Sequence, residues 1–214
     1  MLPVNEVIFS GAILMAVAYL LGSLPFSVWV GKVFYRKDVR EYGSGNAGAT
    51  NTWRVLGWKA GLPVLLLDIG KGFAATFLPY IYPSQTADPE WFLWLRILCG
   101  LAAALGHIYP LFAGFRGGKA VATLLGVILG LMPMAAVGSV VVFILSLGLF
   151  RMVSLGSILA SISLPLMDLI MSPSGQIPLL IFSGLITILV IITHKKNIQR
   201  IIRREESRVR LRKT

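Results

Sequence analysis

The chain has 214 residues, of which 56% are hydrophobic and only 14% are charged, and its formal net charge is +11. An average soluble domain is about one quarter charged, so this composition argues against a soluble protein and indicates one compact polytopic membrane domain. The single cysteine, Cys99, excludes an internal disulfide and a cluster of thiolate zinc ligands.

A helix needs about 20 apolar residues to cross a hydrocarbon core of about 30 Å, and seven segments meet or approach that length. In chain order they are Val7–Val30, Gly61–Ile81, Trp91–Leu111, Lys119–Pro133, Met134–Phe150, Val153–Met171 and Ile177–Thr193. The fourth and fifth are short and adjoining, so six spans are the alternative if these two form a re-entrant pair. The first run is too long for the apolar region of a cleaved signal peptide, and we expect it to remain as a helix.

Lys and Arg are concentrated in alternate connections and in the C-terminal tail. The connections Tyr82–Glu90 and Ser172–Gln176 contain neither residue type. By the positive-inside rule, the N-terminus is outside and the C-terminus is cytoplasmic, which requires an odd number of spans. The sequence therefore predicts an all-α integral membrane protein with seven transmembrane helices. We expect residues 1–202 to form the membrane domain and residues 203–214 a basic tail attracted to anionic lipid.

The cations are not interleaved with aromatic residues as in a nucleic-acid-binding module, so we expect no nucleic-acid partner. Within the third span, the side chain of Arg96 is expected to extend toward the outer interface.

Two Gly-rich polar segments, residues 43–51 and 115–123, interrupt the hydrophobic chain on the predicted cytoplasmic side. Neighbouring glycines allow backbone N–H groups to converge on an oxyanion. A helix starting at Lys119 would direct its positive end and its ammonium group at the same ligand. Further donors are contributed by Ser44, Asn46, Thr50, Asn51 and Arg54. We interpret the two segments as a phosphate site; the alternative is a pair of flexible turns.

Two nucleotide-binding interpretations fail. Residues 43–48 satisfy the G-x-G-x-x-G pattern, but that pattern requires a preceding strand within a βαβ unit, and here the flanks are membrane helices. Residues 114–120 resemble a Walker A loop but are one residue too short. In addition, Ala120 replaces the Ser or Thr that would hold Mg²⁺.

Ionisable residues inside the spans are candidates for structural or functional roles. Asp68 and Lys71 are three residues apart on one helix face and are predicted to pair. This pair fixes helix packing or, alternatively, Lys71 turns to a ligand phosphate. His107, near the end of the third span, is interpreted as a structural residue that positions the following turn.

His194 closes the last span, and Asn197 shares its face if the helix continues. His194 is a candidate for phosphate binding or proton transfer, and the alternative is a helix-end residue that meets the dipole. The sequence has no G-x-S-x-G elbow, and neither His is followed by Asp at the fifth position. No covalent nucleophile is therefore expected.

Taken together, these motifs resemble the PlsY family, the bacterial acyl-phosphate:glycerol-3-phosphate acyltransferases. The resemblance runs from about Tyr19 to Ile201. In order, its motifs are Gly22-Ser23 near Pro25, Gly43-Ser44-Gly45-Asn46-x-Gly48-Ala49-Thr50-Asn51, Asp68-x-x-Lys71-Gly72, Gly106-His107-x-x-Pro110-x-Phe112-x-x-Phe115-x-Gly117-Gly118-Lys119-x-x-Ala122-Thr123 and His194-x-x-Asn197-Ile198-x-Arg200. One departure is Ala120, where the family usually has Gly.

The resemblance implies a seven-helix protein of the bacterial inner membrane with a cytoplasmic active site. It implies transfer of a fatty acyl group from acyl phosphate to the 1-hydroxyl of glycerol 3-phosphate, giving lysophosphatidate and phosphate, as the first step of phospholipid synthesis. Direct transfer without an acyl-enzyme is expected, with no cofactor, no metal and no obligate protein partner. The expected partners are the two substrates and membrane lipid.

By the same resemblance, catalytic roles fall on His194 and Lys119. Roles in substrate or phosphate binding fall on Ser44, Asn46, Thr50, Arg54, Lys71, Gly117, Gly118, Lys119, His194 and Asn197. The alternative functions are a phosphate or organic-anion transporter, whose polar groups would reach both faces of the membrane, and a lipid-binding scaffold without catalysis.

Overall fold

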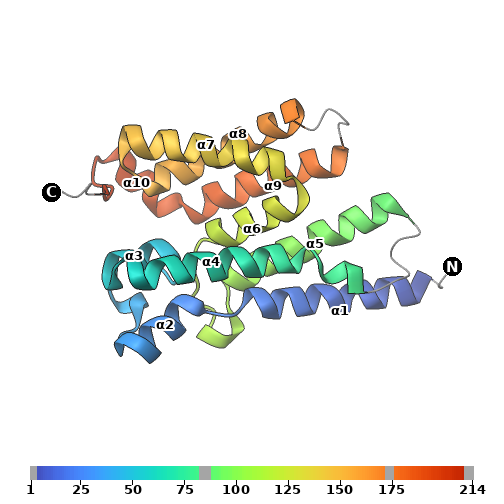
Figure 1. Ribbon diagram of the computed structural model, residues 1–214, viewed down its shortest axis with the longest axis horizontal. Helices are drawn as coiled ribbons and strands as arrows, with labels where there is room; N and C mark the ends of the chain where they lie inside the picture. The colour runs from blue at the N-terminus through green and yellow to red at the C-terminus, as the bar shows by residue number, and fades with distance from the viewer. Residues whose placement is uncertain (1–3, 82–87, 172–175, 210–214) are drawn as a thin grey trace. The chain divides into compact units, whose positions relative to one another are not determined.

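A computed structural model describes residues 4–81, 88–171 and 176–209 of the chain (Figure 1), and the regular elements in these ranges are all helical. Parts of the expected connections Tyr82–Glu90 and Ser172–Gln176, and the last five residues of the basic tail, lie outside these ranges. The chain forms two compact units, Met1–Leu131 and Met132–Thr214.

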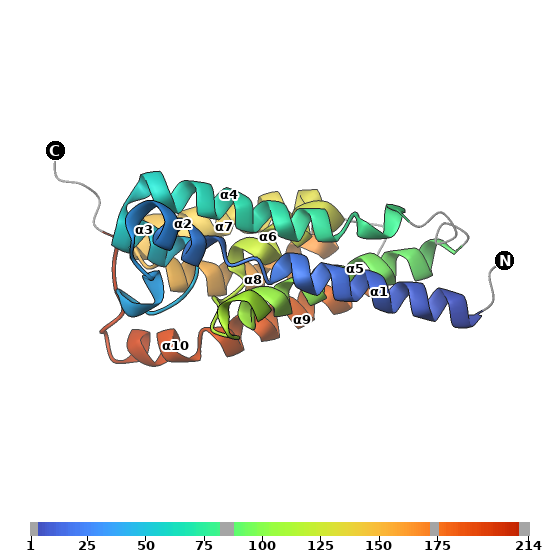
Figure 2. The ribbon, with the colours of Figure 1, turned by 90° about the horizontal axis from the view of Figure 1, so that it is seen from below.

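The first unit is built on two pairs of packed helices. Its α-helices are α1 (Val4–Gly22), α2 (Phe26–Tyr35), α3 (Ala49–Leu56), α4 (Trp58–Ala75), α5 (Pro89–Ile108) and α6 (Val121–Leu131). Short 3₁₀ turns are η1 (Val39–Glu41), η2 (Leu78–Ile81) and η4 (Leu111–Ala113). Helix α1 packs along α5, and α4 packs along α6 (Figures 1 and 2). The short helices α2 and α3 pack against α4.

The expected first span, Val7–Val30, is two helices rather than one. Helix α1 ends at Gly22, and α2 begins at Phe26 after Pro25. Proline lacks an N–H group and disfavours helical geometry in the residue before it, here Leu24, so the helix is interrupted at this point. The interruption is important because it leaves the Leu24 carbonyl available to a partner outside the helix.

Small residues set the distance between the paired helices. A side chain on Gly22 would run into the backbone of Ala103 on α5, and one on Gly72 would run into the backbone of Thr123 on α6. In lipid, helices associate through close van der Waals packing rather than by excluding water, and small residues permit that approach. The approach of α4 to α6 brings Asp68 and Lys71 close to the start of α6.

Arg96 on α5 bonds to the ends of two other helices. Its Nε donates to the carbonyl of Thr76, 3.1 Å away, and Nη2 donates to that of Gly130. The guanidinium also lies 5.5 Å from the Phe77 ring centroid and 5.3 Å from that of Tyr80. These carbonyls lie at the ends of α4 and α6, where no further helical N–H is available, so Arg96 caps both helices.

Asp88 caps the opposite end of α5, since its carboxylate accepts from the backbone N–H groups of Glu90 and Trp91 at 2.9 and 3.2 Å.

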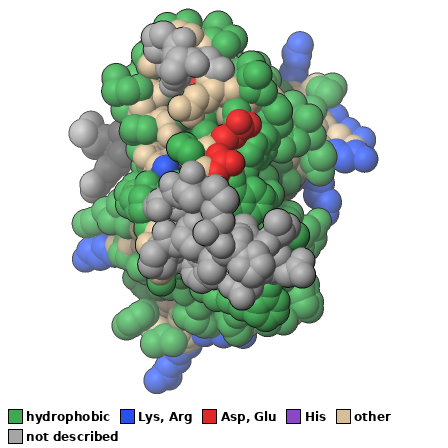
Figure 3. Space-filling model, turned by 90° about the vertical axis from the view of Figure 1, so that its right-hand side faces the viewer, with side chains coloured by type: hydrophobic (Ala, Val, Ile, Leu, Met, Phe, Trp, Pro, Cys, Tyr) green, Lys and Arg blue, Asp and Glu red, His purple; other side chains and the backbone are tan. Residues whose placement is uncertain are grey.

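The face seen in Figure 3 is mostly hydrophobic, and its acidic side chains gather at one place.

In the second unit, α7 (Pro133–Phe150) packs along α8 (Val153–Met171), and α8 packs along α9 (Ile177–Thr193). Helix α9 is followed by α10 (Lys195–Ile202) after a bend of 63°. The condition under which Asn197 would share a helix face with His194, a helix that continues, is therefore not met.

The helices differ from the predicted segments in two places. The first segment is broken at Pro25, and the second, Gly61–Ile81, is α4 up to Ala75 followed by the 3₁₀ turn η2. By length and composition, four helical segments among the described residues are able to cross a membrane, or up to five if α9 and α10 form one bent span. Helix α6 has 11 residues, which correspond to about 16 Å and are too few for a full crossing. Helix α4 is long enough but contains three charged residues, Lys59, Asp68 and Lys71.

Candidate active site

The two Gly-rich segments lie in contact in the first unit, although about 70 residues separate them in the sequence. The Ala47 N–H donates to the Gly117 carbonyl at 3.4 Å. The Ala47 carbonyl in turn would lie 2.9 Å from a Cβ atom on Gly118. The two segments that the sequence assigns to one phosphate site are therefore in contact in the fold.

Asn51 organises the first segment from within. Its side chain is buried, and Nδ2 lies within 2.8–3.1 Å of the carbonyls of Val39, Tyr42 and Asn46. Its Oδ1 accepts from the Ser44 N–H at 2.8 Å. The carboxamide thus gives hydrogen-bond partners to backbone groups of the loop that lack the pairing of a regular element. The sequence suggested that Asn51 binds a ligand, but its side chain is used within the loop.

The remaining donors of the first segment are on its surface. Ser44, Thr50 and Arg54 are exposed, and Asn46 Nδ2 lies 3.4 Å from Ser44 Oγ. Thr50 and Arg54 lie one turn apart on α3, so they share a helix face. The arrangement leaves a hydroxyl and a guanidinium side by side and accessible.

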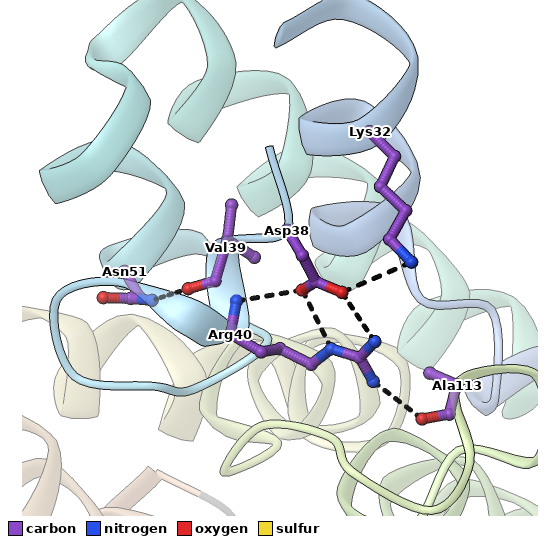
Figure 4. A network of polar contacts seen from close by, with 6 residues as sticks. All are labelled: Lys32, Asp38, Val39, Arg40, Asn51 and Ala113. Carbon is purple, nitrogen blue, oxygen red and sulfur yellow. Dashed lines mark hydrogen bonds and ion pairs between the residues drawn. The ribbon is translucent and has the colours of Figure 1, made fainter. Parts of the chain in front are cut away.

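A clamp between Asp38 and Arg40 joins the loop before the first segment to the turn before the second (Figure 4). The Arg40 Nε and Nη2 atoms donate to the two carboxylate oxygens of Asp38 at 2.9 and 2.7 Å. Arg40 Nη1 donates to the Ala113 carbonyl at 2.8 Å, and Lys32 Nζ lies 3.3 Å from Asp38. The hydrogen bonds from Arg40 hold the pKa of the Asp38 carboxyl well below its ordinary value, although partial burial opposes this.

Sequence reasoning missed this clamp. The sequence feature that could have revealed the clamp is the single Asp of this basic connection, two residues before an Arg. That spacing suits a 3₁₀ turn that follows an Asp, because the Asp carboxylate can accept from a backbone N–H group two residues later. Here the Asp38 carboxylate accepts from the Arg40 N–H at 3.0 Å.

The second segment turns sharply at the residues that flank Lys119. Ala120 is buried and adopts a left-handed backbone conformation with φ of 59°. Helix α6 begins at Val121, two residues after the expected start at Lys119. The conformation explains why Gly is suited to position 120, because a Cβ atom is disfavoured at positive φ. Lys119 itself is half-buried.

The glycines of this turn are packed against the end of α5. A side chain on Gly117 would meet the carbonyls of His107 and Ile108, and one on Gly118 would meet His107 Nε2. The Gly118 N–H also donates to the His107 carbonyl at 3.2 Å. Close packing therefore requires glycine at these two positions independently of any ligand.

The predicted ion pair of Asp68 and Lys71 is confirmed. Lys71 Nζ lies 2.7 Å from Asp68 Oδ1, and each side chain is 2% exposed. The same ammonium donates to the Leu24 carbonyl, 3.0 Å away in the break between α1 and α2. Lys71 therefore has two protein partners and does not lie on the surface of the Gly-rich segments.

A small cavity, with room for about one water molecule, lies above this ion pair. Its lining includes Asp68, Lys71 and His107 together with the backbone of Ala47 and Gly117. The cavity connects the buried charges with both Gly-rich segments.

His194 and Asn197 belong to the second unit, and both are buried. His194 lies at the bend between α9 and α10, where its Nδ1 is 2.8 Å from the Val190 carbonyl. The bond from the Asn197 N–H to the His194 carbonyl, 2.8 Å long, begins α10. The bend rather than a continuous helix thus sets the relation of these two residues.

Glu206 holds Asn197 in place, and sequence reasoning missed it as well. Its carboxylate accepts from Asn197 Nδ2 and Ser154 Oγ, both at 2.6 Å, and from Arg200 Nε at 2.8 Å. Burial alone would raise the pKa of the Glu206 carboxyl, but these three hydrogen bonds bring it below its ordinary value. The signal was a pair of acidic residues within an otherwise basic tail.

The tail beyond α10 also returns to the helices of its own unit. The Val209 N–H donates to the Arg151 carbonyl, 2.7 Å away at the end of α7. Residues 203–209 are thus tied to the ends of α7 and α8.

Comparison with known proteins gives a consistent result. The family described as glycerol-3-phosphate acyltransferase matches residues 12–204 of this chain. A glycerol-3-phosphate acyltransferase of Enterococcus faecalis is 45% identical over 204 residues, which cover 92% of this chain and 91% of the relative. Glycerol-3-phosphate acyltransferase 2 of Bacillus anthracis is 48% identical over 195 residues, or 91% of this chain and 97% of that protein.

Two crystal structures of PlsY (YgiH), an integral membrane glycerol 3-phosphate acyltransferase, are also similar. The glycerol 3-phosphate form gives a TM-score of 0.82 at 38% identity, covering 94% of this chain and 96% of that one. The lysophosphatidic acid form gives a TM-score of 0.80 at 37% identity with the same coverage. The resemblance to the PlsY family is thereby confirmed, and the chain belongs to the glycerol-3-phosphate acyltransferase family.

Proposed function

We propose that the protein transfers a fatty acyl group from acyl phosphate to the 1-hydroxyl of glycerol 3-phosphate, releasing lysophosphatidate and inorganic phosphate. The observation that carries this proposal is the contact between the two Gly-rich segments, which gathers hydroxyl, guanidinium and ammonium donors in one unit. The names of the relatives support the acceptor, since they are glycerol-3-phosphate acyltransferases, and one solved relative is described in a glycerol 3-phosphate form.

The chemistry requires no nucleophile from the protein. Acyl phosphate is a mixed anhydride with a good leaving group. The glycerol hydroxyl oxygen attacks the acyl carbon, the bond from that carbon to the phosphate oxygen breaks, and the hydroxyl proton passes to the departing phosphate or to His194. The protein then needs chiefly to hold two phosphorylated substrates and to neutralise their charge. Cys99 is buried in α5, and this position fits a role in packing.

The binding roles follow the residues on the surface of the segments. We assign phosphate contacts to Ser44, Thr50, Arg54 and Lys119, with Asn46 supporting Ser44. Gly117 and Gly118 contribute backbone groups. Lys71 acts through its ion pair with Asp68 rather than by direct contact, because its ammonium already has two partners.

His194 and Asn197 retain the roles that the family resemblance gives them, in phosphate binding and proton transfer. Their own surroundings support this assignment, because the Val190 carbonyl beside Nδ1 fixes the His194 ring and Glu206 fixes the Asn197 carboxamide.

We further propose that seven helical segments cross or enter a bacterial inner membrane, with the N-terminus outside and the site on the cytoplasmic side. The distribution of Lys and Arg supports this orientation.

The test uses purified protein in detergent with acyl phosphate and glycerol 3-phosphate. Phosphate and lysophosphatidate should appear in equal amounts, and acyl-CoA or acyl carrier protein should not replace the donor. Arg54→Ala and Lys119→Ala should each lower kcat/KM by about a hundredfold or more. No turnover, together with flux of glycerol 3-phosphate into liposomes, would instead favour a transporter. An acyl-enzyme trapped from donor alone would exclude direct transfer, and a His194→Gln variant with full kcat would exclude His194 as the base.

A further inference from the structure

The imidazole of His107 lies buried where three helices meet the second Gly-rich segment. His107 is 6% exposed and stands near the end of α5. Its Nδ1 is 3.5 Å from Asp68 Oδ1 on α4 and 3.2 Å from Thr123 Oγ1 on α6. Two polar partners on two different helices thus fix the plane and the tilt of the ring.

The other edge of the ring supports the turn that carries Lys119. Gly118 rests against Nε2 so closely that no side chain fits between them, and the Gly118 N–H donates to the His107 carbonyl. Gly117 rests on the same carbonyl. The turn is therefore held by both the backbone and the ring of a single residue.

Asp68, which contacts His107, is itself held by further interactions. Asp68 is paired with Lys71, and Lys71 is bonded to the Leu24 carbonyl at the break between α1 and α2. In the low-dielectric interior, an ion pair and its hydrogen bonds are costly to break singly, since one buried charge would be left without a partner. The network therefore ties His107 on α5 to α4 and α6 and, through Lys71, to the break between α1 and α2.

We propose that His107 is a positioning residue for the reaction, which fixes the Gly117–Gly118 turn from below and thereby sets the place of the Lys119 ammonium. This inference rests on the proposed function, in which Lys119 binds substrate phosphate. We place His107 behind the turn and not in contact with substrate, because Gly118 packs against its Nε2 and the cavity that it lines has room for about one water molecule.

Three substitutions separate the parts of this role. His107→Leu fills similar space but removes the contacts to Asp68 and Thr123. His107→Asn retains a polar group at the place of Nδ1, whereas Thr123→Val removes one of its two partners at nearly constant volume. Thr76→Val is the matched control, because Thr76 is a buried residue directly after α4 whose hydroxyl donates to the Phe73 carbonyl within the same helix end.

A measurement independent of enzyme activity tests the position of the turn. Cys99 is the single cysteine, so a Cys99→Ala, Lys119→Cys protein carries one thiol, at the turn. Its rate of reaction with a charged methanethiosulfonate reagent should change about tenfold on adding His107→Leu, since local opening changes access. His107→Asn should change the rate less, and Thr76→Val should leave it unaltered. An unaltered rate in a folded His107→Leu protein would overturn the proposal.

The kinetic test uses a double-mutant cycle with Lys119. In the otherwise native chain, His107→Leu should lower kcat/KM by about a hundredfold, as expected for a misplaced charged group. In the Lys119→Ala background, the same substitution should have little further effect, and His107→Asn should recover part of the loss. Equal losses in both backgrounds would show a general structural role and would contradict the inference. If the wild type lacks acyl phosphate turnover, the proposed function fails, whereas the labelling result still decides the position of the turn.

Discussion

Arg40 donates two side-chain hydrogen bonds to the Asp38 carboxylate, and its remaining terminal nitrogen donates to the Ala113 carbonyl. One guanidinium thus connects a loop near the start of the chain with the turn before the second Gly-rich segment. A planar fork has donors in the directions that this arrangement needs, whereas an ammonium group does not.

Substitution of Arg40 tests the clamp. Arg40→Lys should lower the melting temperature and the affinity for glycerol 3-phosphate nearly as much as Arg40→Ala, because lysine keeps the charge but not the fork. Thermal unfolding and ligand titration in detergent measure both effects. Arg36→Lys is the control, since Arg36 is an exposed cation of the same connection. A fully active and stable Arg40→Lys protein would show that charge alone is sufficient.

The clamp also has a predictable pH dependence. The pKa of Asp38 is lowered in the folded protein, so its contribution to stability is present above the ordinary aspartate pKa of about 3.9 and is lost as pH falls below it. The difference in melting temperature between wild type and Asp38→Asn should stay constant from neutral pH down to about pH 5. It should narrow only at more acidic pH, and a difference that disappears between pH 7 and 5 would contradict this assignment.

Asn51→Asp should destabilise the first Gly-rich segment, although the two side chains have the same size. The carboxylate loses the N–H groups that face three carbonyls, and buried acceptors without donors each cost about 1–3 kcal/mol. Thr52→Val is the matched control, because its buried hydroxyl bonds only to the Gly48 carbonyl. Limited proteolysis should show faster cleavage within residues 39–48 for Asn51→Asp and little change for Thr52→Val.

Ala120→Gly should stabilise the turn after Lys119. A left-handed conformation costs an L-residue about 1–2 kcal/mol, whereas the extra freedom of glycine in the unfolded chain costs about 0.4–1 kcal/mol. The net gain in stability is therefore between about 0 and about 1.6 kcal/mol, visible as a small rise in melting temperature. Ala122→Gly, within α6, should have the reverse effect. If Ala120→Val were equally stable, the positive φ at this position would be wrong.

Glu206→Gln should destabilise the second unit, whereas Glu205→Gln should not. Glu206 accepts from Ser154, Asn197 and Arg200, while its neighbour is exposed. Removal of the charge weakens three bonds, and charge-assisted bonds are worth about 1.5–3 kcal/mol each. Melting curves at neutral pH compare the two variants. Burial raises the pKa of Glu206, but the hydrogen bonds lower it by more. The difference in melting temperature between the two variants should therefore shrink only below about pH 4.

The sequence by itself determined the helices and the family. The expected segments Val153–Met171 and Ile177–Thr193 have the same bounds as α8 and α9. This agreement has a physical reason, because a chain in lipid must satisfy its backbone groups within each helix and cover them with apolar side chains. Both requirements are local and can be recognised from composition. The Asp68–Lys71 pair was recognisable for the same reason, since a helix fixes the spacing of its own residues.

The tertiary structure alone decided how the polar residues are used. The partners of Asn51 and Glu206 lie 5 to 52 residues away in the sequence. Arg40, which pairs with Asp38, reaches the Ala113 carbonyl 73 residues away. Arg96 caps two helix ends that only packing brings within its reach, and the sequence did not indicate these two partners. The Gly-rich segments illustrate the distinction most clearly. Their glycines suggested a ligand from sequence, whereas close packing on His107 also requires two of them, since the distance between a turn and a helix end depends on the whole fold.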